Sequence, residues 1–214
     1  MANSGSTTSV YSVNPTTGFF TLVDTPATGL NIFSLAFSPE VNGMLFAALI
    51  NFSNNTLYIY NVNSTTGAFT LLDSAGTGIS PKSVAFSPFI NDHLFVAVAN
   101  NGDNTISVYS INPTSGAISL LDTATTGTGS SPASVAFSPV VDGQLFAATA
   151  NNGNSSISVF NVNTTSGVFT PVSNLPYSTS IFPNSIAYSP VANNLLFAAV
   201  SSGNANEVAV YSVN

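Results

Sequence analysis

The fold is decided by one nine-residue stretch, VYSVNPTTG at residues 10–18, which returns along the whole chain. Related copies start at residues 59, 108 and 159, so the spacings are 49, 49 and 51 residues. A partial fifth copy, VYSVN at residues 210–214, follows after another 51 residues. Self-similarity at a fixed period of this length indicates a repeat architecture.

Two further markers recur in the same phase, namely an apolar run that ends in Ser-Pro and a Leu-Phe pair that follows it. The Ser-Pro pairs start at Ser38, Ser87, Ser138 and Ser189, and the Leu-Phe pairs start at Leu45, Leu94, Leu145 and Leu196. In the second repeat, four short runs rich in β-branched and aromatic residues cover residues 83–87, 93–99, 105–111 and 117–121. Four short strands per repeat are typical of a propeller blade.

The sequence therefore predicts an all-β fold, a β-propeller of four blades with four strands each. We expect a flexible segment at residues 1–8 and a single propeller domain at residues 9–214. The expected repeats are 9–31 (partial), 32–80, 81–131, 132–182 and 183–214 (partial). Strand 83–87 and its equivalents should be innermost. The phenylalanines of the Leu-Phe pairs should be buried between blades; they are Phe46, Phe95, Phe146 and Phe197.

The ends of the chain are expected to close the ring. With the strands of a blade named A to D from the axis outward, the chain begins with a C-D pair, 9–14 and 19–24, and finishes with A, B and C. The final strand has an apolar edge at Val208, Val210 and Val213, and exposed edges of this kind pair with other strands. We expect strand 19–24, from the same chain or from a neighbour, to cover this edge as strand D. Strand 9–14 is then one too many, and it either adds a fifth strand to the closing blade or pairs with another molecule.

The composition excludes several classes of partner. Only 4% of residues are charged, and the chain has one lysine, Lys82, one histidine, His93, and no arginine. Such a surface cannot neutralise phosphates, so we expect neither nucleic acid nor an anionic membrane as partner. No apolar run reaches the length of a membrane-spanning helix. The absence of cysteine excludes disulfides and thiolate metal sites.

The second repeat resembles a known family. Residues 94–116, LFVAVANNGDNTISVYSINPTSG, look like the blades of the lactonase-like propellers of the 6-phosphogluconolactonase type, and they are similar to the propeller repeats of surface-layer proteins. The resemblance implies a propeller of about seven blades and an activity on phosphorylated sugar lactones. That activity calls for basic residues to hold the phosphate, and only Lys82, expected alone in an inter-blade loop, could serve.

Three carboxylates take the same place in successive repeats. They are Asp24, Asp73 and Asp122, with Asn174 in the fourth repeat. They could form a ring of cation ligands, or each could cap the turn that leaves strand D by accepting local backbone N–H bonds. Because strand D is the outermost strand of a blade, the carboxylates should lie far apart. We therefore expect the capping role.

The other candidates for chemistry stand alone in the sequence. His93 could act as a general base, yet its position in the repeat is simply where strand B begins. The equivalent residues are Met44, Gln144 and Leu195. Asp103 could join Asn104 in a calcium loop, but its counterparts Asn154 and Asn204 indicate plain turn chemistry. No Gly-x-Ser-x-Gly motif is present. We therefore expect no catalytic, cofactor-binding or metal-binding residue.

Three functions from different classes remain. The favoured one is a non-catalytic structural or assembly module on a cell, virion or extracellular polymer, with no enzyme activity and no cofactor. Its partners would be copies of itself, another protein or a glycan. The second is a carbohydrate- or peptide-binding propeller that uses Tyr177 and Phe182. The third is a lactonase-like hydrolase, which the shortage of His, Arg and Lys disfavours. The start of the chain carries no secretory signal, and the sequence leaves the localisation open, with an extracellular or surface position favoured.

Overall fold

The short β-branched and aromatic runs all form strands, because branched side chains pack well on a pleated surface. The computed structural model describes residues 8–26, 31–127, 130–173, 176–179, 182–193, 195–203 and 207–213. These residues contain strands and turns but no α-helix, and so no helix that could cross a membrane. The expected all-β class is confirmed.

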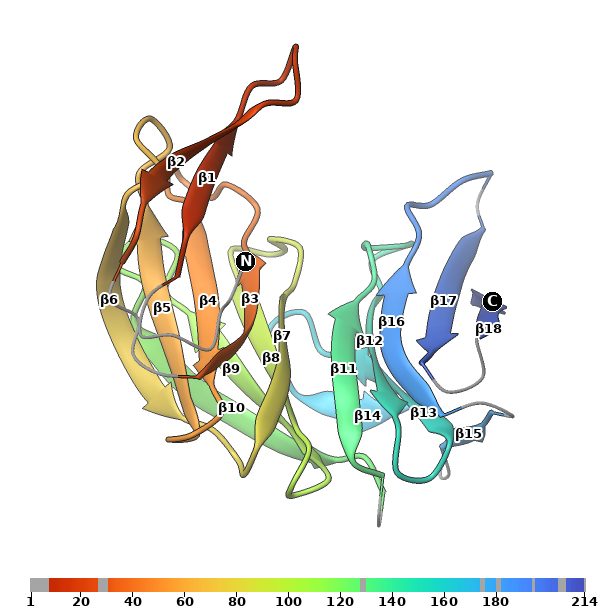
Figure 1. Cartoon of the computed structure of the whole chain (residues 1–214). Helices are drawn as coiled ribbons and strands as arrows, with labels where there is room; N and C mark the ends of the chain where they lie inside the picture. Colours follow the sequence, from red (N-terminus) through yellow and green to blue (C-terminus); the bar gives the residue numbers. More distant parts are fainter. Residues whose placement is uncertain are drawn as a thin grey trace.

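The strands form four larger antiparallel sheets and one hairpin (Figure 1). The hairpin is β1 (Val10–Val13) with β2 (Phe20–Asp24). The first sheet contains β3 (Ile32–Phe37), β4 (Phe46–Asn51), β5 (Thr56–Val62) and β6 (Phe69–Gly76). The second sheet contains β7 (Pro81–Phe86), β8 (Leu94–Asn100), β9 (Thr105–Ile111) and β10 (Ile118–Thr125). The third sheet is β11 (Pro132–Phe137), β12 (Leu145–Asn151), β13 (Ser156–Val162), β14 (Phe169–Pro171), with β15 (Tyr177–Ser178) also on β13. The fourth is β16 (Pro183–Tyr188), β17 (Leu196–Ser202), β18 (Glu207–Val213).

The stretch VYSVNPTTG and its copies build the turn between strands C and D. In the second sheet the Asn112 side-chain oxygen accepts N–H bonds from Thr114 and Ser115, each 3.0 Å long. The Gly116 N–H donates to the Asn112 carbonyl, and Gly116 has a φ of +75°, which a glycine adopts without strain. The same bonds recur at Asn14, Asn63 and Asn163. The repeated sequence is therefore a repeated turn.

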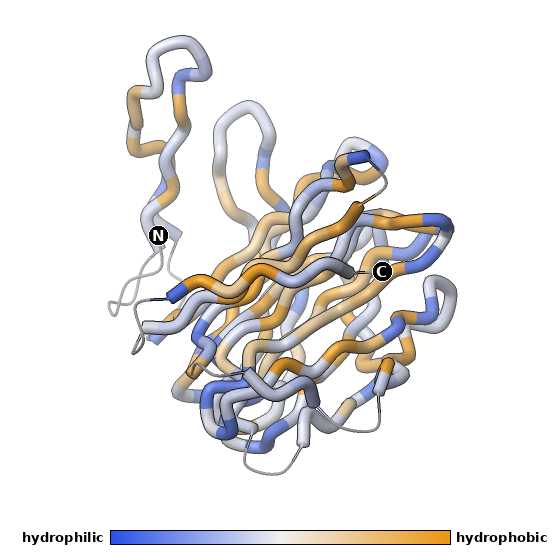
Figure 2. Tube along the Cα trace, turned by 90° about the vertical axis from the view of Figure 1, so that its right-hand side faces the viewer, coloured by the Kyte–Doolittle hydropathy of each residue, from blue (hydrophilic) through white to orange (hydrophobic). Residues whose placement is uncertain are grey.

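The core lies between adjacent sheets, and strand B is the most buried strand of each complete sheet. Every residue of β4 and β8 is buried. One apolar cluster joins the first two sheets, in which Phe46, Ala48 and Ile50 of β4 pack with Val84 of β7. Figure 2 shows apolar segments along the strands and hydrophilic ones at the turns. Each sheet therefore depends on its neighbours for its apolar cover.

The first strands of the sheets are also joined by hydrogen bonds. The backbone N–H of Val84 donates to Ser34 Oγ of the preceding sheet, at 3.4 Å. Val135 donates to Ser83 Oγ at 3.1 Å, and Ile186 donates to Ser134 Oγ at 3.3 Å. These bonds place β3, β7, β11 and β16 side by side on the inner side of the arc in Figure 1. The expectation that strand 83–87 and its equivalents are innermost is confirmed. The strand expected at 83–87 is β7, which runs from Pro81 to Phe86.

The sheets form an open arc, and the expected closure between the ends is not present. Strand β2 pairs with β1, and β18 pairs with β17, but the two terminal groups do not pair with each other. The hairpin is instead held on the first sheet, because the Phe69 N–H donates to Asp24 Oδ2 at 2.8 Å. Strand β1 is thus not a fifth strand of the last sheet, and its pairing with another molecule stays a prediction.

The phenylalanines of the Leu-Phe pairs differ in burial in a way that follows the arc. Phe46 and Phe95 are fully buried, as predicted. Phe146 and Phe197 are only half-buried, so the prediction is wrong for these two. The sheet that follows Phe46 has four strands and the sheet that follows Phe95 has five, whereas the sheet that follows Phe146 has three and no described sheet follows Phe197. Each phenylalanine is thus fully buried where the next sheet has at least four strands and only half-buried where it does not.

This difference gives a matched test of the packing. Replacing Phe95 with Ala should lower the free energy of unfolding by about 3–5 kcal/mol, because it opens a cavity in the core. The same change at Phe197 should cost less than about 1.5 kcal/mol, because that ring is already partly exposed. Urea unfolding of both variants measures the difference. Equal losses would contradict the burial pattern.

Candidate functional site

The two residues with the most obvious catalytic potential lie at opposite ends of one sheet. Lys82 is the second residue of β7, at the start of the inner strand and not in an inter-blade loop as expected. His93 immediately precedes β8, which runs antiparallel to β7 and pairs its Ala99 with Ser83. Six residues separate His93 from Ala99, which is roughly 20 Å along a strand. Lys82 and His93 therefore cannot act on the same small substrate.

His93 lies in a turn that departs from its repeat. The backbone groups of Ile90 and His93 exchange hydrogen bonds of 3.0 and 2.8 Å, which close a two-residue turn of Asn91 and Asp92. Asp92 has a φ of 62°, in the left-handed region, where the first and third repeats have Gly43 and Gly143. A carboxylate has replaced the residue that this backbone conformation favours.

A pocket of about 300 Å³ opens beside this turn. Its polar lining includes the Asp92 carboxylate, the His93 imidazole and the hydroxyls of Ser110 and Ser119. Ser110 of β9 lies directly opposite Ser119 of β10, so the two hydroxyls project from the same face of the sheet. One face of the His93 ring stacks on Phe95, with centroids 5.8 Å apart. The imidazole is thus held in place while it lines the pocket.

The turn of His93 is also tied to the next sheet. The Asn91 side-chain amide donates to Thr164 Oγ1 at 3.0 Å. Thr164 belongs to the turn that leads into β14 of the third sheet. This bond fixes the turn that carries Asp92 and His93 relative to a second blade. The sequence contains the one signal that could have revealed this site, namely the replacement of Gly by Asp beside the only histidine.

The three repeated aspartates join one sheet to the next. The Asp73 side chain accepts the Ser74 N–H through Oδ1 and the Ile118 N–H of the following sheet through Oδ2, both at 2.8 Å. Asp24 and Asp122 make the same pairs of bonds, to Thr25 and Phe69 and to Thr123 and Phe169 respectively. The expected bond to a local backbone N–H is confirmed, but Asp73 and Asp122 lie inside β6 and β10, at irregularities of the pairing, and not at a turn that leaves the strand. The bond to the next sheet was not foreseen. Asn174 lies outside the described residues.

Asp103 and Asn104 serve separate backbone groups. Asp103 Oδ2 accepts the Ile79 N–H at 2.6 Å, and Asn104 Oδ1 accepts the Ser131 N–H at 2.7 Å. Both bonds hold loops that lead into inner strands. In the part of the chain that the structure describes, no group of three or more His, Asp or Glu side chains is placed to hold a metal ion. Asn204, the third member of this set, falls outside that part.

The aromatic candidates and the buried tyrosines offer no reactive group. Tyr177 of β15 and Phe182 are each about half exposed, at 48% and 49%, and neither lines the pocket of His93.

The Tyr109 hydroxyl donates to the Gly76 carbonyl at 2.6 Å. Burial raises the pKa of Tyr109, against a smaller lowering effect of Ser107, and burial also raises the pKa of Tyr188. Both phenols therefore stay protonated at neutral pH.

The comparisons with known proteins agree with this fold. A family model described as "Lactonase, 7-bladed beta-propeller" matches residues 5–137, which is more than half of the chain. The chain belongs to this family. The match includes the turn of Asp92 and His93 and the whole pocket lining around it. A comparison with curated protein sequences found no match.

Solved structures share the architecture at low sequence identity. A provisionally assigned 6-phosphogluconolactonase from Bacteroides uniformis has a TM-score of 0.76 at 21% identity, over 98% of this chain and 62% of its own. The periplasmic gluconolactonase of Pseudomonas aeruginosa has a TM-score of 0.69 at 18% identity, over 97% of this chain and 60% of its own. A protein from Lactobacillus plantarum has a TM-score of 0.75 at 21% identity, over 98% of this chain and 61% of its own. This chain therefore spans about three fifths of their length, and at such identities the likeness shows the fold alone.

Family membership corrects two functional expectations. A non-catalytic structural module and the absence of enzyme activity were favoured because the chain lacks arginine and has one lysine and one histidine. Membership of a lactonase family contradicts both. The charge argument excludes tight binding of a phosphate, but opening a lactone needs an activated water and a polarised carbonyl. Neither the activation of water nor the polarisation of the carbonyl requires a basic residue besides those of this chain.

The aspartate bonds between sheets can be tested directly. Asp73→Ala leaves two backbone N–H groups without their acceptor, so it should lower the free energy of unfolding by about 2–3 kcal/mol. Asp73→Asn keeps an acceptor oxygen and should lose about half as much. Glu40→Ala, which removes an exposed carboxylate, is the control and should change stability by less than about 0.5 kcal/mol. Thermal or urea unfolding of the three variants measures this order, and an Asp73→Ala loss no greater than the control would refute the role.

Proposed function

We propose that this chain is a lactonase-type hydrolase that opens uncharged sugar lactones. Membership of the lactonase family carries the proposal. The pocket of His93 supports it, because it groups a base, a carboxylate and two hydroxyls in a space of about 300 Å³. That volume is at the lower end of the range for small-molecule sites. The chemistry therefore fits a substrate of the size of one sugar ring.

Charge selects between the substrates that the solved relatives suggest. The two assigned neighbours are named for 6-phosphogluconolactone and for gluconolactone. This chain has a formal charge of −7, and its only lysine lies roughly 20 Å from the pocket. A phosphate beside Asp92 would be repelled, and no cation lies close enough to offset that repulsion. We therefore infer the uncharged lactone.

The proposed reaction uses His93 as general base. Its imidazole takes a proton from a water molecule, whose oxygen attacks the lactone carbonyl carbon. The Asp92 carboxylate stabilises the imidazolium that forms, and the hydroxyls of Ser110 and Ser119 donate hydrogen bonds to the carbonyl oxygen as its charge grows. The bond between the carbonyl carbon and the ring oxygen then breaks, and the imidazolium returns its proton to that oxygen. The product is the open hydroxy acid.

We infer further that the four sheets and the hairpin are consecutive blades of a propeller ring with more than four positions. The family is named for seven blades, and the arc is open with four sheets in place. The solved relatives match the arc across 96–98% of this chain with about 60% of their own lengths. Closing a ring with only four sheets would require a larger rotation between neighbouring sheets than closing a ring with more sheets.

Hydrolysis of gluconolactone tests the activity. The wild-type protein should accelerate ring opening above the uncatalysed rate, followed by alkali uptake at constant pH. His93→Ala should lower kcat/KM by about 100-fold or more, the usual contribution of a general base. Lys82→Ala should stay within about threefold of the wild type, because Lys82 lies at the other end of the sheet.

The phosphorylated lactone tests the substrate class. Under the same conditions, 6-phosphogluconolactone should react at least about tenfold more slowly than gluconolactone. No acceleration of either lactone by the wild type would refute the hydrolase. Full activity in His93→Ala would place the reaction elsewhere in the fold.

A further inference from the structure

An asparagine that is followed by glycine can cyclise onto the backbone with little hindrance, because glycine has no side chain to block the approach. The chain contains three such pairs, which begin at Asn42, Asn101 and Asn152. Asn42 lies in the turn between β3 and β4, whereas Asn101 and Asn152 follow β8 and β12. The same dipeptide therefore occurs in three different surroundings within one molecule.

The pair of the second sheet is held by two hydrogen bonds. The Gly102 N–H donates to the Ile79 carbonyl at 3.0 Å, and the Asn101 side-chain amide donates to the Pro132 carbonyl at 3.3 Å. The Ile79 side chain also fills the space beside the glycine, since a Cβ at Gly102 would lie 2.8 Å from Ile79 Cγ2. Cyclisation requires the glycine nitrogen to turn toward the side chain of the asparagine, so these contacts oppose it.

The pair of the third sheet is held in the same manner. The Gly153 N–H donates to the Ser130 carbonyl at 2.9 Å, and the Asn152 side-chain amide donates to Asn184 Oδ1 at 2.6 Å. Both reacting groups are thus bonded to other parts of the protein, and both bonds must break before the side chain can meet the backbone nitrogen.

The turn of Asn42 and Gly43 lacks these restraints. Val41 and Met44 close it with two backbone hydrogen bonds of 2.8 Å, and the φ values of 52° and 76° at the central residues are those of a type I′ turn. Both central residues are exposed. Among the described residues, neither the Asn42 side chain nor the Gly43 N–H has a hydrogen-bond partner, and a Cβ at Gly43 would meet nothing within 4 Å. The central peptide can therefore rotate without breaking the bonds that close the turn.

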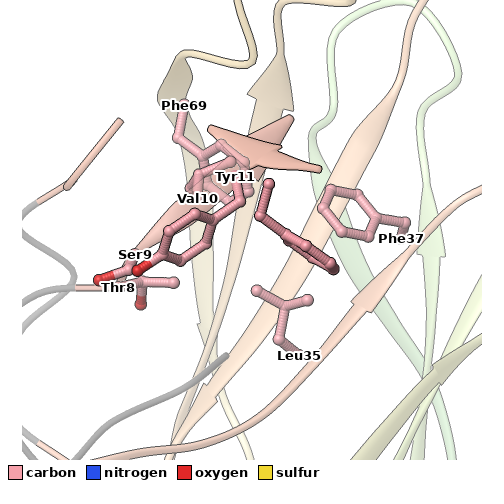
Figure 3. A pocket seen from close by; sticks show the side chains of 8 residues that line it. Thr8, Ser9, Val10, Tyr11, Leu35, Phe37 and Phe69 are labelled. Atoms are coloured by element: carbon pink, nitrogen blue, oxygen red, sulfur yellow. The ribbon is translucent and has the colours of Figure 1, made fainter. Parts of the chain in front are cut away.

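The exposure of this turn is a property of the repeat. The equivalent turn of the third repeat, Asp142 and Gly143, belongs to a sheet that is bonded to a sheet on each side, and it is exposed as well. A Cβ at Gly143 would also meet nothing within 4 Å. A pocket of about 540 Å³ beside the hairpin is lined by Leu35 and Phe37 of β3, the strand before the turn, but not by Asn42 (Figure 3). The turn is thus open to water for a reason other than the open arc.

We propose that Asn42 is a site of spontaneous deamidation in the folded protein. The Gly43 nitrogen loses its proton and attacks the side-chain carbonyl carbon of Asn42. As the new bond forms, the bond from that carbon to the amide nitrogen breaks, and the amide group leaves with the proton as ammonia. Water then opens the cyclic succinimide at either of its carbonyl carbons, which leaves aspartate or isoaspartate at this position. The site is independent of the proposed hydrolase activity.

The two products differ in their effect on the turn. Aspartate keeps the backbone unchanged, and the third repeat already has Asp142 at this position, with a φ of 49° against 52° at Asn42. Isoaspartate adds a carbon atom to the backbone of the turn, so the two bonds between Val41 and Met44 cannot both keep their geometry. Because Val41 is buried in the core between the first two sheets, the isoaspartyl form should be the less stable product.

Ageing of the folded protein tests the site. The protein is kept in mildly alkaline buffer without ammonium salts, and its chymotryptic peptides are analysed by mass spectrometry for conversion of the amide to a carboxylate. Chymotrypsin suits a chain with one lysine and sixteen phenylalanines. Asn42 should react at least about tenfold faster than Asn101 and Asn152, because only its reacting groups are free to meet. Equal rates, or a faster reaction at either of the other two, would overturn the proposal.

The matched control is the same chain unfolded in guanidinium chloride. The three pairs should then react within about threefold of one another, because the contacts that distinguish them are absent from the unfolded chain. A preference for Asn42 that persists in the denaturant would show that the local sequence selects the site, and it would overturn the argument from the fold.

The variant Asn42→Asp separates the two products. It should fold with the wild-type strand content by circular dichroism and release no ammonia from this turn. Aged wild-type protein whose isoaspartate is detected by enzymatic methylation of its carboxylate should unfold at a lower guanidinium concentration than this variant. Equal unfolding midpoints would contradict the expected effect of isoaspartate on the turn.

Discussion

Backbone N–H groups that donate to side-chain oxygens of a neighbouring sheet are the contact on which this structure depends. Serine hydroxyls make these bonds on the inner side of the arc and aspartate carboxylates make them on the outer side. Between the two rows lies an apolar layer built from strand B of one sheet and the first strand of the next. A blade is therefore held at both edges, and the outer bonds are made by the residues that directly follow the repeated turn.

The shortage of charge shapes the function as much as the fold. A chain with one lysine is poorly suited to a phosphorylated ligand, whereas the activation of water that we propose needs only a single well-placed base. The proposed base is His93, which follows Asp92 in a turn where the first and third repeats have glycine at the position of Asp92. The first and third repeats have Gly43 and Gly143 at this position, so among the described turns the carboxylate there is particular to the second repeat.

The sequence predicted the strands, the repeats and the order of strands from the axis, because period and turn chemistry are local properties. It predicted the local bond of Asp73 but missed the bond to Ile118, because that partner is 45 residues away and belongs to another blade. It treated His93 as a plain strand start and did not predict the pocket beside it, because the lining residues Ser110 and Ser119 come from other strands of the sheet. Closure of the ring was expected from strand counting, but counting carries no information on the rotation between sheets, and the Asp24 bond holds the hairpin on the first sheet.

The regular junctions have a consequence for how the chain folds. Each sheet contacts only the sheets before and after it, so its stability is a sum of local and nearest-neighbour terms. Folding can then nucleate in the second sheet, whose neighbours on both sides are complete, and propagate outward in steps. The terminal sheet and the hairpin, with one neighbour each, would be the last to order and the first to fray. Hydrogen exchange should accordingly be slowest at the centre of the chain and fastest at its two ends.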